Sequence, residues 1–271
     1  MGGKLKDLAC NAASMSDHHV IRLGCAGWNV PKQHGLHFEA EGSHLQRYSR
    51  GLNACEVNSS FYRSHRKETW ERWAATVPCD FQFAVKVPKT ITHIAWPLFD
   101  VRAFSAFLVQ VSALGRKLGV ILFQFPPSVA YERVAVRRYL QKIRGIFAGE
   151  VAWEPRNASW FNETVDDVLN EFRIARVAAD PACVPAAALP GGSPTTAYFR
   201  LHGAPRRHYS AYPSTFLRTK ASELANLSVT AKVWCIFDNT AAGFAIPNAL
   251  ELKEHLGILR SKSLATQIDV T

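Results

Sequence analysis

Residues 120–124 read VILFQ and residues 151–154 read VAWE, with a helical pattern of apolar side chains between them. Each run is a short apolar stretch that ends in a polar residue, as buried parallel strands do. The pattern between the two runs consists of Val136, Leu140, Ile143 and Phe147, spaced three or four residues apart. A strand, a helix and a second strand in this order predict a parallel βαβ unit.

The same unit recurs along the chain. Eight runs of this kind lie at residues 20–24, 55–58, 81–86, 120–124, 151–154, 176–180, 196–200 and 233–238. Eight strands that alternate with helices predict an α/β fold, a single (β/α)8 TIM barrel with its site at the C-terminal ends of the strands. We expect the barrel to occupy residues 20–260 of the 271, with a loose N-terminal leader (1–19) and a C-terminal tail (261–271).

Charge and composition bound the classes of partner. The chain carries 32 Lys and Arg against 22 Asp and Glu, a net charge of +10. This excess favours an anionic small molecule or a nucleic acid as partner, although an ordinary basic protein can have the same balance. No apolar run is long enough to span a membrane, and residues 1–19 lack the apolar core of a signal peptide. Six cysteines without a C-x-x-C pair do not suggest a disulfide framework, so we expect a cytoplasmic protein whose oligomeric state is left open.

Alternation along the strands indicates which polar side chains face the barrel interior. Side chains on a strand point to opposite faces in turn, so residues of equal parity share a face. Five strand ends place a charged side chain on a face whose other residues are mostly small or apolar: Glu56, Lys86, Glu154, Arg200 and Asp238. Buried charges are costly unless paired. We therefore expect these groups to meet and pair at the barrel mouth, where simple structural salt bridges are the alternative explanation for any one of them.

Glu56 and Glu154 are the candidate acid and base. Across a barrel mouth their carboxyl groups would lie roughly 6–10 Å apart, a separation that leaves room for a water molecule. A neighbouring Lys86 or Arg156 would lower the pKa of one carboxyl, and an apolar wall would raise that of the other. His202 is a further candidate for proton transfer.

The other candidates would bind the ligand. Lys86, Arg156 and Arg200 suit an anion. Aromatic side chains such as Trp28 and Trp160 suit a base or a sugar ring, although packing under loops explains both tryptophans equally well. The full set of candidate ligand-binding residues is Trp28, Asn58, Tyr62, Lys86, His93, Gln124, Arg156, Trp160, Arg200, Asp238 and Asn239.

The sequence identifies no metal site and no cofactor. It contains no H-E-x-x-H pair, no phosphate-binding P-loop and no G-x-S-x-G elbow. His93 and His202 are the only histidines near strand ends, so Mg²⁺ bound by carboxylates and water stays an open but unsupported alternative. Cys25 follows the first strand and is a candidate nucleophile, but nothing nearby in the sequence marks it as activated.

Eight short motifs follow one another in a fixed order. They are GCAGW (24–28), EVNSSFY (56–62), FAVKVP (83–88), ITH (91–93), LFQFPPS (122–128), WEPRNASW (153–160), YFRLHG (198–203) and FDNT (237–240). In this order the chain resembles the YecE-like family, domain-of-unknown-function family number seventy-two, from about Ile21 to Leu256.

The resemblance implies a TIM barrel, in agreement with the strand count, but no established reaction. Members of the family have been compared with TIM-barrel endonucleases that act at abasic sites, which is a fold-level analogy. The positions that match the family pattern include Glu56, Asn58, Lys86, His93, Gln124, Glu154, Arg156, Arg200 and His202. The chain departs from the pattern at Cys25-Ala26, where Thr-Ser is common, and at Asp238-Asn239, where Asn-Asn is frequent.

Three classes of function are compatible with this sequence. The first is an enzyme that binds a phosphate-containing or other anionic ligand at the mouth, with hydrolysis (phosphodiesterase- or nuclease-like) as its reaction. The second is a non-catalytic nucleic-acid-binding protein that uses the basic, aromatic loop 202–213. The third is a carbohydrate-active enzyme with paired carboxylates and a tryptophan platform.

Overall fold

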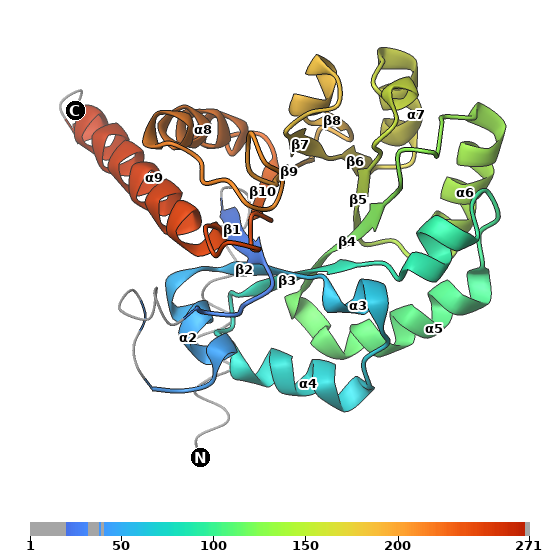
Figure 1. The fold of residues 1–271 in the computed structure, drawn as a ribbon, viewed down its shortest axis with the longest axis horizontal. Helices are drawn as coiled ribbons and strands as arrows, with labels where there is room; N and C mark the ends of the chain where they lie inside the picture. Colours follow the sequence, from blue (N-terminus) through green and yellow to red (C-terminus); the bar gives the residue numbers. More distant parts are fainter. Residues whose placement is uncertain (1–19, 32–37, 39–40, 269–271) are drawn as a thin grey trace.

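The computed structural model of the chain describes residues 20–31, 38 and 41–268, with side chains up to residue 257. Its strands form one sheet that curves into a ring (Figure 1), in the order β7-β9-β10-β1-β2-β3-β4-β5-β6-β8. The strands are β1 (Ile21–Ala26), β2 (Ala54–Val57), β3 (Gln82–Lys86), β4 (Leu118–Gln124), β5 (Glu150–Glu154), β6 (Ile174–Arg176), β7 (Ala178–Asp180), β8 (Gly191–Gly192), β9 (Thr196–Leu201) and β10 (Lys232–Phe237). All pairs are parallel except β6–β8, which confirms the predicted barrel.

The predicted sixth strand is divided into two, and the division closes the ring. β6 pairs with β5, whereas β7 pairs with β9 on the other side of the gap. Val177 joins the two strands, and its N–H donates to the carbonyl of Trp153 at 2.9 Å. β8 was not predicted because it is only two glycines long. Its Gly192 has φ +68°, and a Cβ there would lie 2.4 Å from the Ile174 carbonyl oxygen, so only glycine fits against β6.

Helices cover the outside of the ring (Figure 1). They are α2 (His44–Gly51), α3 (Ser59–Tyr62), α4 (Lys67–Thr76), η4 (Thr90–Ile94), α5 (Val101–Val111), η5 (Ser112–Lys117), α6 (Arg133–Ile146), η6 (Ala158–Trp160), α7 (Glu163–Glu171), η7 (Pro185–Ala188), α8 (Ser214–Leu227) and α9 (Ala245–Ile268). Asp100 and Asn162 cap α5 and α7 by accepting backbone N–H bonds of 2.9 and 3.1 Å.

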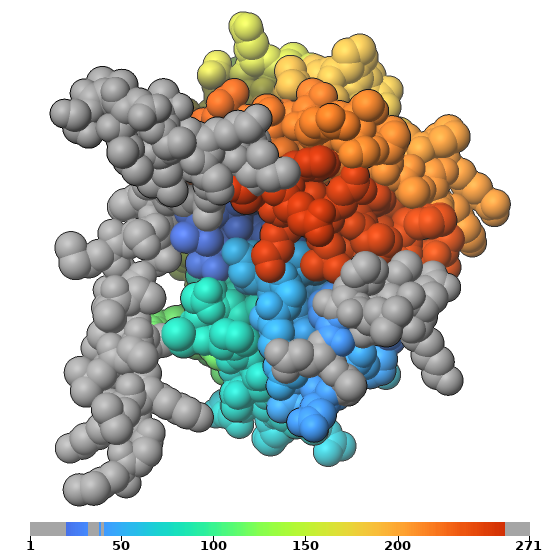
Figure 2. Space-filling model, turned by 90° about the vertical axis from the view of Figure 1, so that its left-hand side faces the viewer, coloured from blue at the N-terminus to red at the C-terminus, as the bar shows by residue number. Residues whose placement is uncertain are grey.

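The last helix packs over the start of the barrel. α9 contacts α8 and β1, and in Figure 2 it is the red ribbon of atoms between the orange and blue parts of the surface. It runs to Ile268, past residue 260, where the sequence predicted the barrel domain to end. The predicted leader (1–19) and the final residues 269–271 lie outside the described residues.

The barrel interior is closed at its base by large side chains. Trp234 stacks on Tyr198 with ring centroids 6.0 Å apart, and small residues such as Ala54, Ala84 and Ala152 face them from the other strands. Gly119 completes the fit, because a Cβ at this position would lie 2.4 Å from the Trp234 ring. Inward-pointing charged side chains therefore lie above and below this layer: the group at the C-terminal mouth, and at the other end Glu150, which accepts from Thr196 at 2.8 Å and pairs with Lys232 at 3.2 Å. Within the described part of the chain, no helix has both the length and the apolar character needed to cross a bilayer.

Candidate active site at the barrel mouth

Arg200 is the centre of the charged groups at the mouth. It lies on β9 and is completely buried. Its Nε and Nη2 donate to the Glu56 carboxylate at 3.0 and 2.7 Å, and its Nη1 donates to Glu154 Oε2 at 2.7 Å. Nη2 also donates to Asp238 Oδ2 at 2.9 Å. The alternation argument thus predicted correctly that these strand ends meet, since side chains from β2, β5, β9 and the end of β10 share one network.

The network favours the ionised form of Glu154. Burial alone would raise the pKa of Glu154, but Arg200 and Arg156 hold it well below its usual range. Burial likewise opposes the charge of Arg200, yet Glu154 and Glu56 raise its pKa well above the ordinary value. Four of the five guanidinium N–H groups are engaged by carboxylates, so Arg200 has little capacity left to hold a ligand.

The two glutamates are separated by the Arg200 guanidinium, at the place where the sequence analysis expected a water molecule. Glu56 is completely buried and accepts a further bond from the hydroxyl of Tyr198 at 2.9 Å. Glu154 is 1% exposed and accepts two bonds from Arg156, at 3.1 and 3.2 Å. This geometry makes both carboxylates supports for the arginines.

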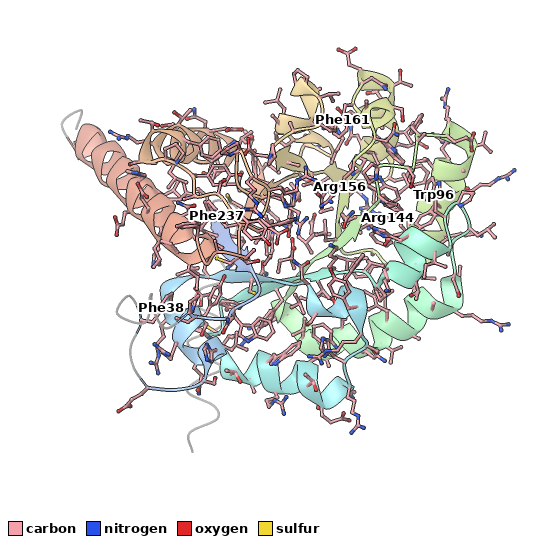
Figure 3. The ribbon with its side chains drawn as sticks, in the orientation of Figure 1. Phe38, Trp96, Arg144, Arg156, Phe161 and Phe237 are labelled. Carbon is pink, nitrogen blue, oxygen red and sulfur yellow. The ribbon has the colours of Figure 1, made fainter. Side chains whose placement is uncertain are left out.

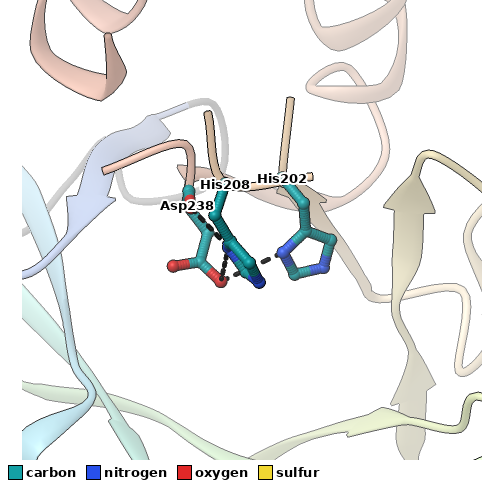
Figure 4. A group of neighbouring side chains, drawn as sticks. All are labelled: His202, His208 and Asp238. Carbon is teal, nitrogen blue, oxygen red and sulfur yellow. Dashed lines mark hydrogen bonds and ion pairs between the residues drawn. The ribbon is translucent and has the colours of Figure 1, made fainter. Parts of the chain in front are cut away.

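Two histidines face Asp238 (Figure 4). The Nδ1 of His202 lies 3.0 Å from Asp238 Oδ2, and its Nε2 lies 3.3 Å from Glu154 Oε1, so a fully buried imidazole links two carboxylates. His208 is 41% exposed at its side chain, and its Nδ1 donates to the backbone carbonyl of Asp238 at 2.9 Å. Burial would raise the pKa of Asp238, but Arg200 and His202 lower it to about 2.

His208 was not among the predicted site residues. Its backbone lies at φ +67°, a left-handed conformation that is uncommon for a residue other than glycine and is found often at functional sites. Its N–H donates to the His202 carbonyl at 2.5 Å. In the sequence only the basic run 206–208 drew attention to it.

Within the described part of the chain, one group of side chains has the spacing that a metal ion would need. His202, His208 and Asp238 offer ligand atoms that all lie within 4.8 Å of one another. However, Asp238 Oδ2 also accepts from Nη2 of Arg200, so a cation bound to this oxygen would lie beside a buried guanidinium. The donor set therefore fits a hydrogen-bonded network better than a metal centre.

Lys86 and Arg156 are the cations nearest to solvent at the mouth. Arg156 lies inside the ring of helices (Figure 3) and remains 23% exposed while it bonds to Glu154. Lys86, at the end of β3, is 8% exposed, and its Nζ lies 4.2 Å from the centre of the Phe61 ring. His93 also contacts Phe61, with the ring centroids 5.0 Å apart.

Several predicted ligand-binding residues do not reach the mouth. Trp160 is completely buried under a loop, where its Nε1 donates to the Val129 carbonyl, so the prediction that it stacks on a ligand is wrong. Asn239 is buried and bonds to Ser210 and Asn248. Gln124 does lie at the mouth, since it pairs in register with Glu154, but its amide is engaged there because it donates to the neighbouring carbonyl of Phe125. Cys25 is buried, and burial raises its pKa, which removes it as a thiolate nucleophile.

Trp28 and Asn58 line a cavity of about 550 Å³ beside the mouth, together with residues that follow β2 and β10. Trp28 presents its edge to Trp73, with ring centroids 4.8 Å apart, so it forms part of an aromatic wall. Tyr62, the last residue of α3, is largely exposed. These residues border the site, whereas Arg200, its carboxylates and the two histidines form its floor.

The fold and this floor define a (β/α)8-barrel protein with a buried ionic network at the C-terminal mouth. The chain belongs to the DUF72 family: the family model described as "Protein of unknown function DUF72" matches residues 22–269. The UPF0759 protein YunF of Bacillus subtilis is 27% identical over 93% of this chain and 100% of its own length. The UPF0759 protein YecE of Escherichia coli K12 is 28% identical over 62% of each chain.

Solved structures agree with the assignment. A DUF72 family protein of Enterococcus faecalis V583 is 25% identical, with a TM-score of 0.75 over 88% of this chain and 96% of its own. A DUF72 family protein of Thermotoga maritima MSB8 is 26% identical, with a TM-score of 0.74 over 88% of this chain and 100% of its own. The resemblance seen in the sequence is thereby confirmed, and so is the barrel.

Proposed function

We propose that this protein is an enzyme that binds a phosphate-bearing ligand at the barrel mouth and hydrolyses it. The single observation that carries the proposal is the order of charges with depth. The carboxylates of Glu56 and Glu154 are buried and already bound to Arg200, whereas the guanidinium side chain of Arg156 remains 23% exposed. A ligand that enters the mouth therefore meets cations first, and the net charge of +10 favours the approach of an anion.

The contacts suggest a role for each group. Arg156 bonds to Glu154 through Nε and Nη2, which leaves Nη1 for a phosphate oxygen, and Lys86 supplies a second positive charge. His208 donates from Nδ1, so in the neutral ring Nε2 carries a lone pair and can accept a proton from water. His202 and the buried carboxylates hold these groups in position.

Binding and turnover test the proposal separately. Titration calorimetry with inorganic phosphate and phosphate esters should detect binding that Arg156→Met weakens by about 10- to 100-fold, as the loss of a charged hydrogen bond predicts. Arg138→Met, an exposed arginine on the outer face of α6, is the matched control and should bind like the wild type.

Turnover is measured on a panel of aryl phosphate monoesters and diesters. His208→Asn keeps a residue that tolerates the left-handed backbone and removes the imidazole, so kcat should fall by about 10²- to 10⁴-fold. A wild type that binds no phosphate compound and hydrolyses none would overturn the proposal, and equal turnover by wild type and His208→Asn would remove His208 from it.

A specific contact favours nucleic-acid binding as a second candidate. In loop 202–213 the guanidinium of Arg206 lies 4.0 Å from the centre of the exposed Tyr209 ring, an arrangement suited to a phosphate and an adjacent base. Binding of a fluorescent single-stranded oligonucleotide should then weaken steeply with added salt and be lost in Arg206→Met. Affinity that does not depend on ionic strength would exclude this candidate.

A further inference from the structure

Lys86 differs from the other cations of the site because it has no carboxylate partner. Among the described residues no carboxylate oxygen lies within 4.0 Å of its Nζ, and no hydrogen bond to Nζ is formed. Its main contact is the Phe61 ring at 4.2 Å. The backbone that carries Lys86 is fixed, since its carbonyl accepts from Ser60 Oγ at 2.7 Å and the next N–H bonds to β4.

The surroundings of Lys86 disfavour its protonated form. Burial is the largest cause and Arg200 is the next, and together they lower the pKa of Lys86 to about 8 despite the attraction of Glu154, Glu56 and Asp238. His93 faces it from η4. Burial and the Lys86 charge lower the pKa of His93, so this imidazole is neutral near pH 7.

We propose that Lys86 is a nucleophile that captures the carbonyl group of a small phosphate-bearing aldehyde or ketone as an imine at the barrel mouth. The geometry supports this: an amine without an ion pair, at the end of a barrel strand, is held on an aromatic ring, and both Lys86 and Arg156 are close enough to His93 to act on its charge. The inference rests on the proposed phosphate site for the anionic end of the ligand, and it adds the carbonyl end.

The step is balanced without any further reactant. The Nζ lone pair attacks the carbonyl carbon, a C–N bond forms, and the carbonyl oxygen receives a proton that the nitrogen loses. The resulting carbinolamine expels this oxygen as water, which takes the second nitrogen proton and leaves the imine. His93 is placed to carry these protons, because its ring and the Lys86 ammonium contact the same phenyl ring of Phe61.

Reductive trapping on the wild-type protein tests the inference. The protein is incubated at pH 7 with glycolaldehyde phosphate or with glycolaldehyde, in the presence of cyanoborohydride, and the labelled lysines are identified by peptide mass spectrometry. At pH 7 an amine with a pKa of about 8 is neutral roughly 200-fold more often than a surface lysine. Lys86 should therefore be labelled faster than the exposed Lys142 by about this factor, and its rate should level off above pH 8 while that of Lys142 keeps rising.

The two probes separate this inference from the proposed function. If Lys86 reacts faster with glycolaldehyde phosphate than with glycolaldehyde, and this preference disappears in Arg156→Met, the result supports both the imine and the phosphate site. Equal labelling of Lys86 by both probes supports the imine and contradicts the phosphate site. Labelling of Lys142 but not of Lys86 overturns the imine, and the phosphate site then stands or falls with calorimetry. Lys86→Arg, checked for native circular dichroism, should lose the fast label and keep the slow ones.

Discussion

The outer layer and the barrel mouth use positive charge in opposite ways. Between the barrel and α4, Lys117 donates to the carbonyls of Ala74 and Val77, each at 2.6 Å, and so satisfies the end of a helix. At the mouth, Lys86 is buried without an ion pair, and Arg200 is buried among three carboxylates. The outer lysine binds backbone carbonyls that would otherwise lack a hydrogen-bond donor, which stabilises the fold. The mouth keeps charged side chains buried, which destabilises the fold unless they are paired.

Removing Arg200 should have the largest effect. Arg200→Met leaves Glu56, Glu154 and Asp238 buried without their common cation, which should lower the free energy of unfolding by about 3–5 kcal/mol at pH 7. Arg176→Met is the control on the outer side of the sheet, where the lost bonds to Asp166 and to the carbonyls of Ala186 and Leu189 should cost about 1–3 kcal/mol. Both values come from urea unfolding.

The pH dependence of Arg200→Met identifies the cause. In the wild type the pKa of Glu154 lies below its unfolded value, so its pairing stabilises the protein above that value and this stability is lost as the pH falls. In the variant the carboxyls can be protonated instead. The difference between wild type and variant should therefore shrink from pH 7 to pH 4, and an equal difference at both pH values would mean that packing, not charge, explains the loss.

The two lysines provide the next test. Lys117→Met should lower the free energy of unfolding by about 1–3 kcal/mol, since two carbonyls lose their donor. Lys86→Met should instead raise it at pH 7 by about 1–3 kcal/mol, because it removes a buried, unpaired charge. A loss of stability in both variants would contradict the contrast between the layers.

The sign of the pH effect at Lys86 follows from its lowered pKa. The folded value of about 8 lies below the ordinary 10.5, so the folded protein binds fewer protons than the unfolded chain between these pH values. Below pH 8 the buried charge therefore destabilises the wild type by its full amount, and this destabilisation disappears as the pH rises toward 10.5. The advantage of Lys86→Met should disappear over the same range in urea titrations.

The sequence predicts the inward groups well because alternation is a local property. Parity alone brought Glu56, Lys86, Glu154, Arg200 and Asp238 to one rim, and the structure brings their side chains together there. The same rule applies to Tyr198, two residues before Arg200, which packs in the interior below it.

What the sequence could not provide are relations set by packing between distant segments. That Arg200 would separate the two glutamates depends on strand register around the whole ring. Trp160 has the composition of a ligand platform, and only the position of its loop buries it. The division of the sixth strand at Val177 likewise depends on pairing with β5 and β9 at once.

The smallest predicted effect concerns the backbone of His208. A residue with a Cβ pays about 1 kcal/mol to occupy the left-handed region, and glycine does not. His208→Ala and His208→Gly both lack the imidazole, so their difference isolates the backbone: the glycine variant should be more stable by about 1 kcal/mol in urea unfolding. At the neighbouring Tyr209, whose φ is not positive, the same pair should give the opposite order.

The result also distinguishes what holds the loop in place. The His208 N–H and carbonyl are both bonded, to the His202 carbonyl and to the Ala241 N–H, and these bonds do not need the ring. If they fix the conformation, glycine is favoured at this position as predicted. If the ring itself fixes it through the Asp238 carbonyl, the loop relaxes to an ordinary backbone in both variants, and the alanine variant becomes the more stable one, as at Tyr209; the strained backbone is then a consequence of the histidine ring.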